Sequence, residues 1–231
     1  MTLLTHFPLC PHSRSIRLAL SELGVKCEMA EERPWDWRPE FLALNPSGDL
    51  PVLELDGSAV LAGAYAISEY LDEARPGSEE GRRMVLFPGD AQSRAEVRRL
   101  VDWFHKKLDG EVTRELLREK LHPRLRPELA SQTPDTDLMR AIGANLRYHM
   151  SYMNHLVDQR SWLAGDDMSF ADLAAAAHLS CLDYCDEVPW DEHSAARSWY
   201  ARVKSRPSFR PLLADRLAGA PPPKHYADLD F

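Results

Sequence analysis

The chain has 231 residues, and its 28 lysines and arginines against 36 aspartates and glutamates give a formal net charge of −8. This acidic balance argues against a protein that holds nucleic acid by its phosphates, because such proteins are usually basic. No run approaches the roughly 18 apolar residues of a spanning helix, and the first six residues lack the pattern of a signal peptide, so we expect neither.

The acidic excess lies entirely in the first third of the chain. Residues 1–80 contain 6 basic and 14 acidic side chains, whereas residues 81–231 contain 22 of each. The length suits two compact domains, and this change in composition indicates a boundary near residue 80.

Short apolar runs and turn residues alternate over the first 76 residues. Residues 3–7 form an apolar run, and Pro11 then opens a helix over 11–23, because its missing N–H costs nothing in the first turn. The pattern further predicts strands at 25–29, 51–55 and 59–61, with a hairpin turn at Asp56 and Gly57 between the last two. It also predicts helices over 40–44 and 65–74, and Pro76 and Gly77 end the second of these helices.

Only helices are predicted after a linker over 77–90. Apolar residues recur at three- and four-residue spacing from 97 to 116, and a proline-bearing loop is expected over 121–136. Ser169 is expected to cap a helix that is apolar nearly all round, with Asp172 reaching back to the cap, which indicates a buried central helix. The other predicted helices cover 138–159, 194–205 and 209–217, and prolines keep the tail over 220–231 extended.

Three motifs occur in register across the two halves of the chain. Residues 7–14 read Phe-Pro-Leu-Cys-Pro-His-Ser-Arg, residues 45–53 read Asn-Pro-Ser-Gly-Asp-Leu-Pro-Val-Leu, and Trp-Leu-Ala-Gly at 162–165 precedes Ser-Phe-Ala-Asp at 169–172. Together these motifs resemble the glutathione transferase superfamily.

The resemblance implies a two-domain fold. We expect an α/β thioredoxin-like N-terminal domain over 1–76, the linker over 77–90, an all-α C-terminal domain over 91–219 and an extended tail over 220–231. The resemblance also implies a cis peptide bond between Leu50 and Pro51.

Cys10 stands where thiol-using members of this family carry their catalytic residue. The predicted helix begins directly after it, so free N–H groups and partial positive charge lie near the sulfur, and Arg14 one turn on can add to this. Attack of a Cys10 thiolate on a disulfide is one hypothesis, and a retained but unused cysteine is the other. Cys27, Cys181 and Cys185 are interpreted as buried free thiols in a reducing cytosol, and they do not predict a metal site.

The segment that binds the γ-glutamyl end of glutathione in the family departs from the family pattern. Members usually read Leu-x-Glu-Ser-x-Ala-Ile-x-x-Tyr-Leu, and here Gly63 and Ala64 stand at the Glu-Ser positions. Loss of two charge-assisted hydrogen bonds weakens binding by on the order of 10²–10⁴. Leu50 and Pro51 remain to hold the cysteinyl backbone. We therefore expect a degenerate site with no cofactor and no metal, and glutathione only under the catalytic alternative.

Three features favour a protein partner. Trp35 and Trp37 lie two positions apart in a proline-flanked segment, and an extended chain would point their side chains in opposite directions. The alternative is that one tryptophan packs into the first domain.

Residues 94–126 carry ten basic and six acidic side chains. Most of these suit a solvated helix face, but the cluster beside the loop suits an acidic partner. The tail mixes aromatic and acidic residues and is either a partner contact or a strap over its own domain. The partner-binding candidates are Trp35, Trp37, Arg118, Glu119, Lys120, Arg124, Arg126, Tyr226, Asp228 and Phe231.

Three details point to one subfamily. The Cys-Pro-His-Ser-Arg start, the missing Glu-Ser pair and the ending Pro-Pro-x-His-Tyr-Ala-Asp-Leu-Asp-Phe resemble the FtsZ-binding, glutathione-transferase-like division proteins of alphaproteobacteria. The resemblance implies a cytoplasmic homodimer at the division site that binds FtsZ filaments and regulates their curvature and constriction, without transferase chemistry. The alternatives are a Cys10-dependent glutathione transferase or thiol reductase, and a small-molecule binder that uses the cleft between domains.

Overall fold

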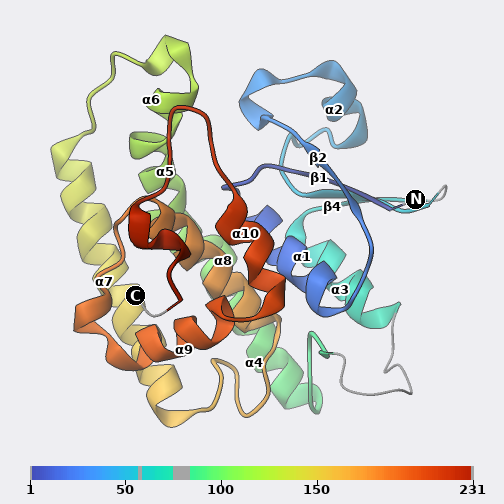
Figure 1. Cartoon of the computed structure of the whole chain (residues 1–231). Coiled ribbons are helices and arrows are strands. Elements are labelled where there is room, and N and C mark those ends of the chain that lie inside the picture. The colour runs from blue at the N-terminus through green and yellow to red at the C-terminus, as the bar shows by residue number, and fades with distance from the viewer. Residues whose placement is uncertain (1, 57–58, 75–83, 230–231) are drawn as a thin grey trace.

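A computed structural model describes residues 2–56, 59–74 and 84–229. Figure 1 shows two domains side by side, one that contains a β-sheet with its helices and a larger one made of helices. This confirms the predicted fold class, a thioredoxin-like α/β domain followed by an all-α domain. Several predicted features lie outside the described residues, namely Gly57 of the hairpin turn, Pro76 and Gly77, part of the linker, and Phe231.

The predicted order β-α-β-α-β-β-α is confirmed in the first domain. Its elements are β1 (Leu3–His6), α1 (Pro11–Glu22), β2 (Glu28–Glu31), α2 (Pro39–Leu44), β3 (Val52–Glu54), β4 (Val60–Ala62) and α3 (Ala64–Glu73). The strands lie in the order β2-β1-β3-β4, with β1 parallel to β2 and antiparallel to β3. Leu4 is fully buried in β1 and pairs with Leu53 of β3, so the core begins at the centre of the sheet.

The second strand begins later than predicted. Gly24 takes a φ of 64°, and the Val25 N–H donates to the Leu20 carbonyl at 2.8 Å. Val25 therefore belongs to the turn that closes α1, and pairing with β1 starts only at Glu28.

The described part of the second domain is helical. Its helices are α4 (Ala91–Asp102), α5 (Arg114–Lys120), α6 (His122–Leu125), α7 (Thr136–Gln159), α8 (Phe170–Tyr184), α9 (Ser194–Lys204) and α10 (Arg210–Ala214). A π-helical segment, Trp103–Thr113, joins α4 to α5 where the sequence predicted a regular helix. The predicted loop over 121–136 is wrong at its start, because Pro123 falls in the first turn of α6. Among the helices of the described ranges, none is both long and apolar enough to cross a membrane.

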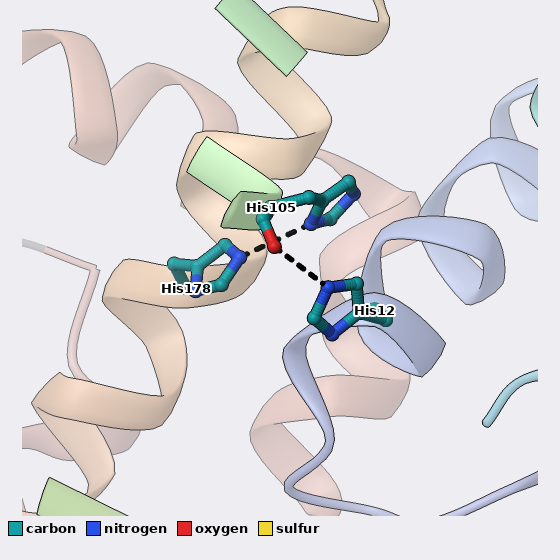
Figure 2. Close-up of side chains that lie close together, drawn as sticks. All are labelled: His12, His105 and His178. Carbon is teal, nitrogen blue, oxygen red and sulfur yellow. Dashed lines mark hydrogen bonds between the residues drawn. The ribbon is translucent and has the colours of Figure 1, made fainter. Parts of the chain in front are cut away.

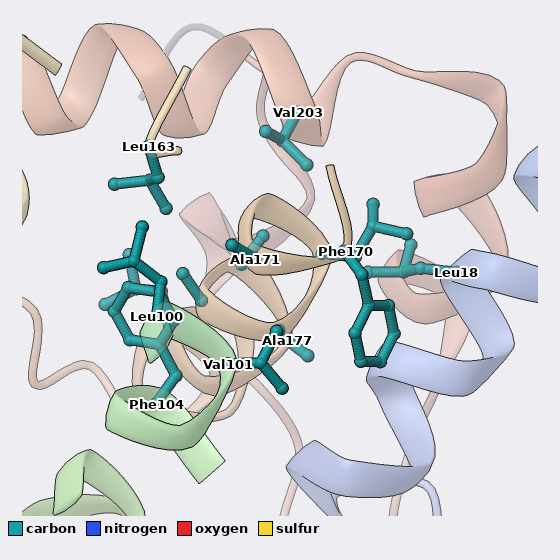
Figure 3. Close-up of a cluster of buried hydrophobic side chains, with 14 of the residues drawn as sticks. Leu18, Leu100, Val101, Phe104, Leu163, Phe170, Ala171, Ala177 and Val203 are labelled. Carbon is teal, nitrogen blue, oxygen red and sulfur yellow. The ribbon is translucent and has the colours of Figure 1, made fainter. Parts of the chain in front are cut away.

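Helix α8 is the buried centre of the second domain. All fifteen of its residues are buried, as its nearly uniform apolar sequence predicted. Small side chains such as Ala171 and Ala177 let the neighbouring helices approach closely. Figure 3 shows Leu18 of α1 and Val203 of α9 packed around this helix.

The predicted cap of α8 is confirmed at Asp172. Its fully buried carboxylate accepts hydrogen bonds from the Ser169 N–H at 2.9 Å and the Ser169 hydroxyl at 3.2 Å. It also accepts from the Leu163 N–H at 3.0 Å and from Trp199 Nε1 at 2.9 Å. One side chain therefore ties the preceding loop and α9 to the first turn of α8.

Replacing Asp172 with asparagine is expected to lower the free energy of unfolding by about 1.5–3 kcal/mol, because an amide NH₂ cannot accept the two bonds from Ser169. Denaturant unfolding measures this loss, with the exposed Asp167→Asn as the matched control. If Asp172→Asn lowers the free energy of unfolding by less than about 0.5 kcal/mol, the loop before α8 keeps its structure without the carboxylate.

Arg14 of α1 lies buried on the boundary between the domains. Its guanidinium donates to the Pro8 carbonyl at 2.6 Å, Ser180 Oγ at 2.8 Å, Tyr226 Oη at 2.9 Å and Asp215 Oδ2 at 3.1 Å. The hypothesis that Arg14 assists Cys10 is therefore wrong, because its side chain is directed into the boundary with the second domain.

Candidate functional site

A cavity of about 490 Å³ opens between the two domains. It is lined on one side by the start of α1 and the turns before β3 and α3, and on the other by the π-helical segment and α5. Cys10, Leu50, Gly63 and Ala64 all line it. The structure thus brings together the residues that the sequence assigned to a glutathione site, and the implied cis bond at Leu50–Pro51 is confirmed.

Cys10 is the residue that caps the N-terminus of α1. Its sulfur accepts a hydrogen bond from the Ser13 N–H at 3.5 Å and lies 4.0 Å from the Leu50 carbonyl oxygen. The thiol is half-buried and free of any disulfide. It is therefore reachable from the cavity, at the N-terminus of a helix.

Gly63 and Ala64 form the start of α3 without offering a polar side chain. Gly63 takes a φ of 87°, and its N–H donates to the Pro51 carbonyl at 2.9 Å. A Cβ at Gly63 would meet nothing within 4 Å, and Ala64 is 4% exposed. In this part of the cavity wall, the start of α3 presents backbone groups and one methyl group to a ligand.

Three histidines lie close together (Figure 2), and two of them, His12 and His105, also line the cavity. His12 Nε2 lies 3.1 Å from the His105 carbonyl oxygen, and His105 Nδ1 lies 3.1 Å from His178 Nε2. They come from α1, the π-helical segment and α8. The sequence does not reveal this cluster, because its members lie 93 and 73 positions apart and only His12 stands beside a motif residue, Cys10.

The hydrogen bonds of the cluster assign its protons. The Ser15 hydroxyl donates to the His12 carbonyl at 2.8 Å, so at 3.3 Å it accepts from His105 Nε2. His105 Nδ1 is then the acceptor for His178 Nε2, and His178 Nδ1 accepts from the Thr113 hydroxyl at 2.9 Å. Although three histidine nitrogens lie close enough to suggest metal ligands, a metal ion here must displace hydrogen bonds that already satisfy them.

The three rings differ in charge. Burial lowers the pKa of His105 and of His178 well below the usual value, so both are neutral at pH 7. Burial also opposes charge on His12, but its hydrogen bond and charge interaction with Cys10, with help from Asp109 and the His105 carbonyl, raise the pKa of His12 to about 9. His12 is therefore the one ring of the three whose pKa lies above its usual value.

The structure separates the two tryptophans. Trp35 packs edge-on against Phe7 with ring centres 5.0 Å apart, whereas Trp37 is 64% exposed. The extended segment predicted here is wrong, because Pro34–Asp36 form a 3₁₀ turn and Trp37 takes a φ of 48°. The Trp37 ring covers Gly48, where a Cβ would lie 3.1 Å from it. Trp37 is thus the member of the pair that a partner can reach.

Two residues of the predicted cluster over 118–126, Glu119 and Lys120, contact other parts of the chain. Glu119 accepts a hydrogen bond from the Asp135 N–H at 2.9 Å, at the start of α7. Lys120 forms an ion pair with Glu187, in the turn after α8. These contacts give Glu119 and Lys120 structural partners within the chain.

The arginines of this cluster are more open. The Arg118 side chain is 69% exposed, and its Nη1 lies 3.8 Å from Glu115 Oε2. Arg124 is exposed on α6. Arg126 is partly covered and pairs with Glu128 at 2.7 Å. Arg118 and Arg126 also line a surface hollow of about 580 Å³ beside α5 and α6.

The tail is fastened to its own domain by Tyr226. Its ring is 1% exposed, and its hydroxyl donates to the Leu212 carbonyl at 3.2 Å and accepts from Arg14. The prediction that Tyr226 contacts a partner is therefore wrong, because the side chain is an internal anchor. Asp228 and Leu229 stay exposed beyond it, and Phe231 lies outside the described residues.

Comparison with known proteins agrees with this arrangement. The family model for the glutathione S-transferase N-terminal domain matches residues 4–79, and that for the glutathione S-transferase C-terminal domain matches residues 116–207. The chain belongs to the glutathione S-transferase family.

Individual proteins match over nearly the whole chain. FtsZ-localized protein A of Caulobacter vibrioides is 45% identical over 231 residues, covering 99% of this chain and 97% of that protein. The solved structure of FzlA from C. crescentus matches with a TM-score of 0.93 and 45% identity, over 100% of this chain and 99% of that one. A glutathione S-transferase from Sinorhizobium meliloti 1021 matches with a TM-score of 0.93 and 48% identity over the full length of both chains.

Proposed function

We propose that this member of the glutathione S-transferase family binds FtsZ filaments and regulates their curvature and constriction, without transferase catalysis. The observation that carries the proposal is the match to FtsZ-localized protein A, which spans 99% of the chain and so includes both domains. On this proposal the chain acts in the cytoplasm, at the division site.

The exposed partner-binding candidates beside α6, Trp37 and Arg124, suit contact with an acidic filament. The Trp35 ring lies 5.2 Å from His122 of α6, so the turn that exposes Trp37 adjoins α6. Arg124, also on α6, lines a hollow together with Pro221 and Pro223 of the tail. An exposed aromatic side chain beside exposed arginines is a favourable composition for a protein interface.

A homodimer fits this role, because two copies present the surface twice and can connect or bend a filament. An aromatic face on α7 and the π-helical segment supports self-association. Tyr148 is 58% exposed there, and the Trp103 and Tyr152 rings beside it lie 4.7 Å apart. Analytical ultracentrifugation of the wild type and of Tyr148→Glu tests the dimer, and a monomeric wild type would contradict it.

Calorimetry is expected to show no glutathione binding tighter than about millimolar, because the start of α3 lacks the usual polar side chains. Ala64→Ser returns one hydroxyl and is expected to tighten binding by about tenfold. The exposed Ala66→Ser on the same helix is the matched control. Sub-millimolar binding by the wild type would contradict a non-catalytic role.

A Cys10-dependent glutathione transferase or thiol reductase is the second candidate. It is favoured by the position of the thiol, at a helix N-terminus and facing the cavity. This candidate predicts glutathione-dependent reduction of a small disulfide that Cys10→Ser abolishes.

Co-pelleting with polymerised FtsZ tests the filament proposal. Trp37→Ala is expected to lower the pelleted fraction, because it removes an exposed aromatic side chain from the proposed surface. No enrichment of the wild type in the pellet rejects the proposal.

A further inference from the structure

The surface hollow beside α5 and α6 has a volume of about 580 Å³, and three arginines line it, Arg114, Arg118 and Arg126. We infer that this hollow binds an anion that carries two or more linked phosphate groups. The inference goes beyond the proposed function, whose exposed side chains, Trp37 and Arg124, do not line the hollow.

Arg114 and Arg118 are only weakly neutralised. They lie four positions apart on α5, a rise of about 6 Å, and like charges at this spacing destabilise a helix. Both share one carboxylate, Glu115, whose oxygens lie 3.7 Å from Arg114 Nε and 3.8 Å from Arg118 Nη1. In the part of the chain that the structure describes, neither guanidinium donates a hydrogen bond, and the two side chains are 66% and 69% exposed. Their N–H groups are therefore available to an anion.

Arg126 is held in place before any ligand binds. Its Nε donates to Glu128 Oε1 at 2.7 Å, and 28% of the side chain is exposed. This bond occupies Nε, so Nη1 and Nη2 keep their N–H donors. Leu129 and the amide of Gln132 complete the lining. The hollow thus combines one fixed arginine with two open ones.

The lining of the hollow carries excess positive charge. Its three arginines share the lining with one carboxylate, Glu115, and Glu128 pairs with one of them from outside. Asp109, whose charge interacts with Arg114, lines the cavity between the domains instead. Burial and the positive charge of two of these arginines lower the pKa of His122, so this ring is neutral at pH 7. The hollow therefore favours a ligand with more than one negative charge.

Linked phosphates fit this arrangement better than a single phosphate. A planar guanidinium can donate two parallel hydrogen bonds to one phosphate group. Two arginines lie one turn apart on α5 and the third follows α6, so phosphates linked in a chain can each meet a different arginine. The volume lies within the range of small-molecule sites, roughly 300–1,000 Å³. A free polyphosphate and a nucleoside triphosphate share this chemistry.

Calorimetry with tripolyphosphate on the full-length chain, at about 0.1 M salt and without FtsZ, tests the inference. The expected dissociation constant is below about 1 mM, and inorganic phosphate is expected to bind at least about tenfold more weakly. ATP and GTP distinguish the two sources of the ligand. Binding no tighter than that of tripolyphosphate indicates a site for phosphates alone, and tighter binding indicates that the nucleoside also contacts the hollow; either result supports the inference.

A charge-removing variant and a spectroscopic signal locate the ligand. Arg118→Gln is expected to weaken tripolyphosphate binding by about tenfold, because it removes one charged donor. The matched control, Arg140→Gln, makes the same change at a 77% exposed arginine of α7 and is expected to stay within about twofold of the wild type. In NMR titrations, tripolyphosphate is expected to raise the pKa of His122, because a nearby negative charge favours the imidazolium, and to leave that of the exposed His155 unchanged.

Four results would each overturn the inference. They are a dissociation constant for tripolyphosphate above about 1 mM, inorganic phosphate binding as tightly as tripolyphosphate, equal losses in Arg118→Gln and Arg140→Gln, and an unchanged pKa of His122. Because the assay contains no FtsZ, none of these results bears on filament binding.

Discussion

Replacing Arg14 with methionine is expected to lower the free energy of unfolding by about 3–5 kcal/mol, because removal of one partner from a buried charged network leaves the others without hydrogen bonds. The Pro8 carbonyl and the hydroxyls of Ser180 and Tyr226 lose their shared donor. Asp215 keeps Arg17, which donates to both of its carboxylate oxygens at 2.8 and 2.9 Å.

Guanidinium unfolding of Arg14→Met against the wild type measures this loss. The control is Arg210→Met, an exposed arginine on α10, which is expected to change the free energy of unfolding by no more than about 0.5 kcal/mol. A loss below about 1 kcal/mol in Arg14→Met would mean that the boundary between the domains is held by apolar packing alone.

Reversing the charge of Arg124 is expected to weaken FtsZ binding by about 10–100-fold, or roughly 1.4–2.7 kcal/mol. The reason is that a glutamate at this position would face the proposed acidic filament, and like charges across an interface repel strongly. Arg124 is exposed beside the tail, and the structure records no ion pair for it among the described residues, so the change leaves the fold intact. Titration of labelled Arg124→Glu onto polymerised FtsZ measures the affinity.

Arg210→Glu is the control for this charge reversal, since it makes the same change on another exposed helix. Its affinity for FtsZ is expected to stay within about twofold of the wild type. Equal losses in Arg124→Glu and Arg210→Glu would show that net charge, rather than the surface beside α6, decides binding.

The fold of the first domain was predictable because local signals agree with the tertiary structure. Prolines and glycines mark the ends of its helices, and alternating apolar runs give its strands. In the second domain, spacing correctly predicted the burial of α8. Spacing did not predict the π-helical segment, because apolar residues three and four apart suit both helix types. The short α6 was missed because Pro123 suits a loop and a first helical turn equally.

The site was only partly predictable. Motif register placed Cys10, Leu50, Gly63 and Ala64 together, and the cavity confirms that placement. The histidine cluster depends on contacts between helices distant in sequence, which spacing does not reveal. Tyr226 was misassigned because an aromatic residue in a polar tail suits an anchor and a partner contact equally, and only its burial distinguishes them.

Co-pelleting of the wild-type chain with FtsZ is the most direct test of the proposed role. FtsZ polymerised with GTP is centrifuged with the chain, and FtsZ kept unpolymerised with GDP is the control. The chain is expected to be enriched in the pellet only with polymer, and excess free glutathione is expected to leave the enrichment unchanged. Equal recovery with and without polymer would contradict it.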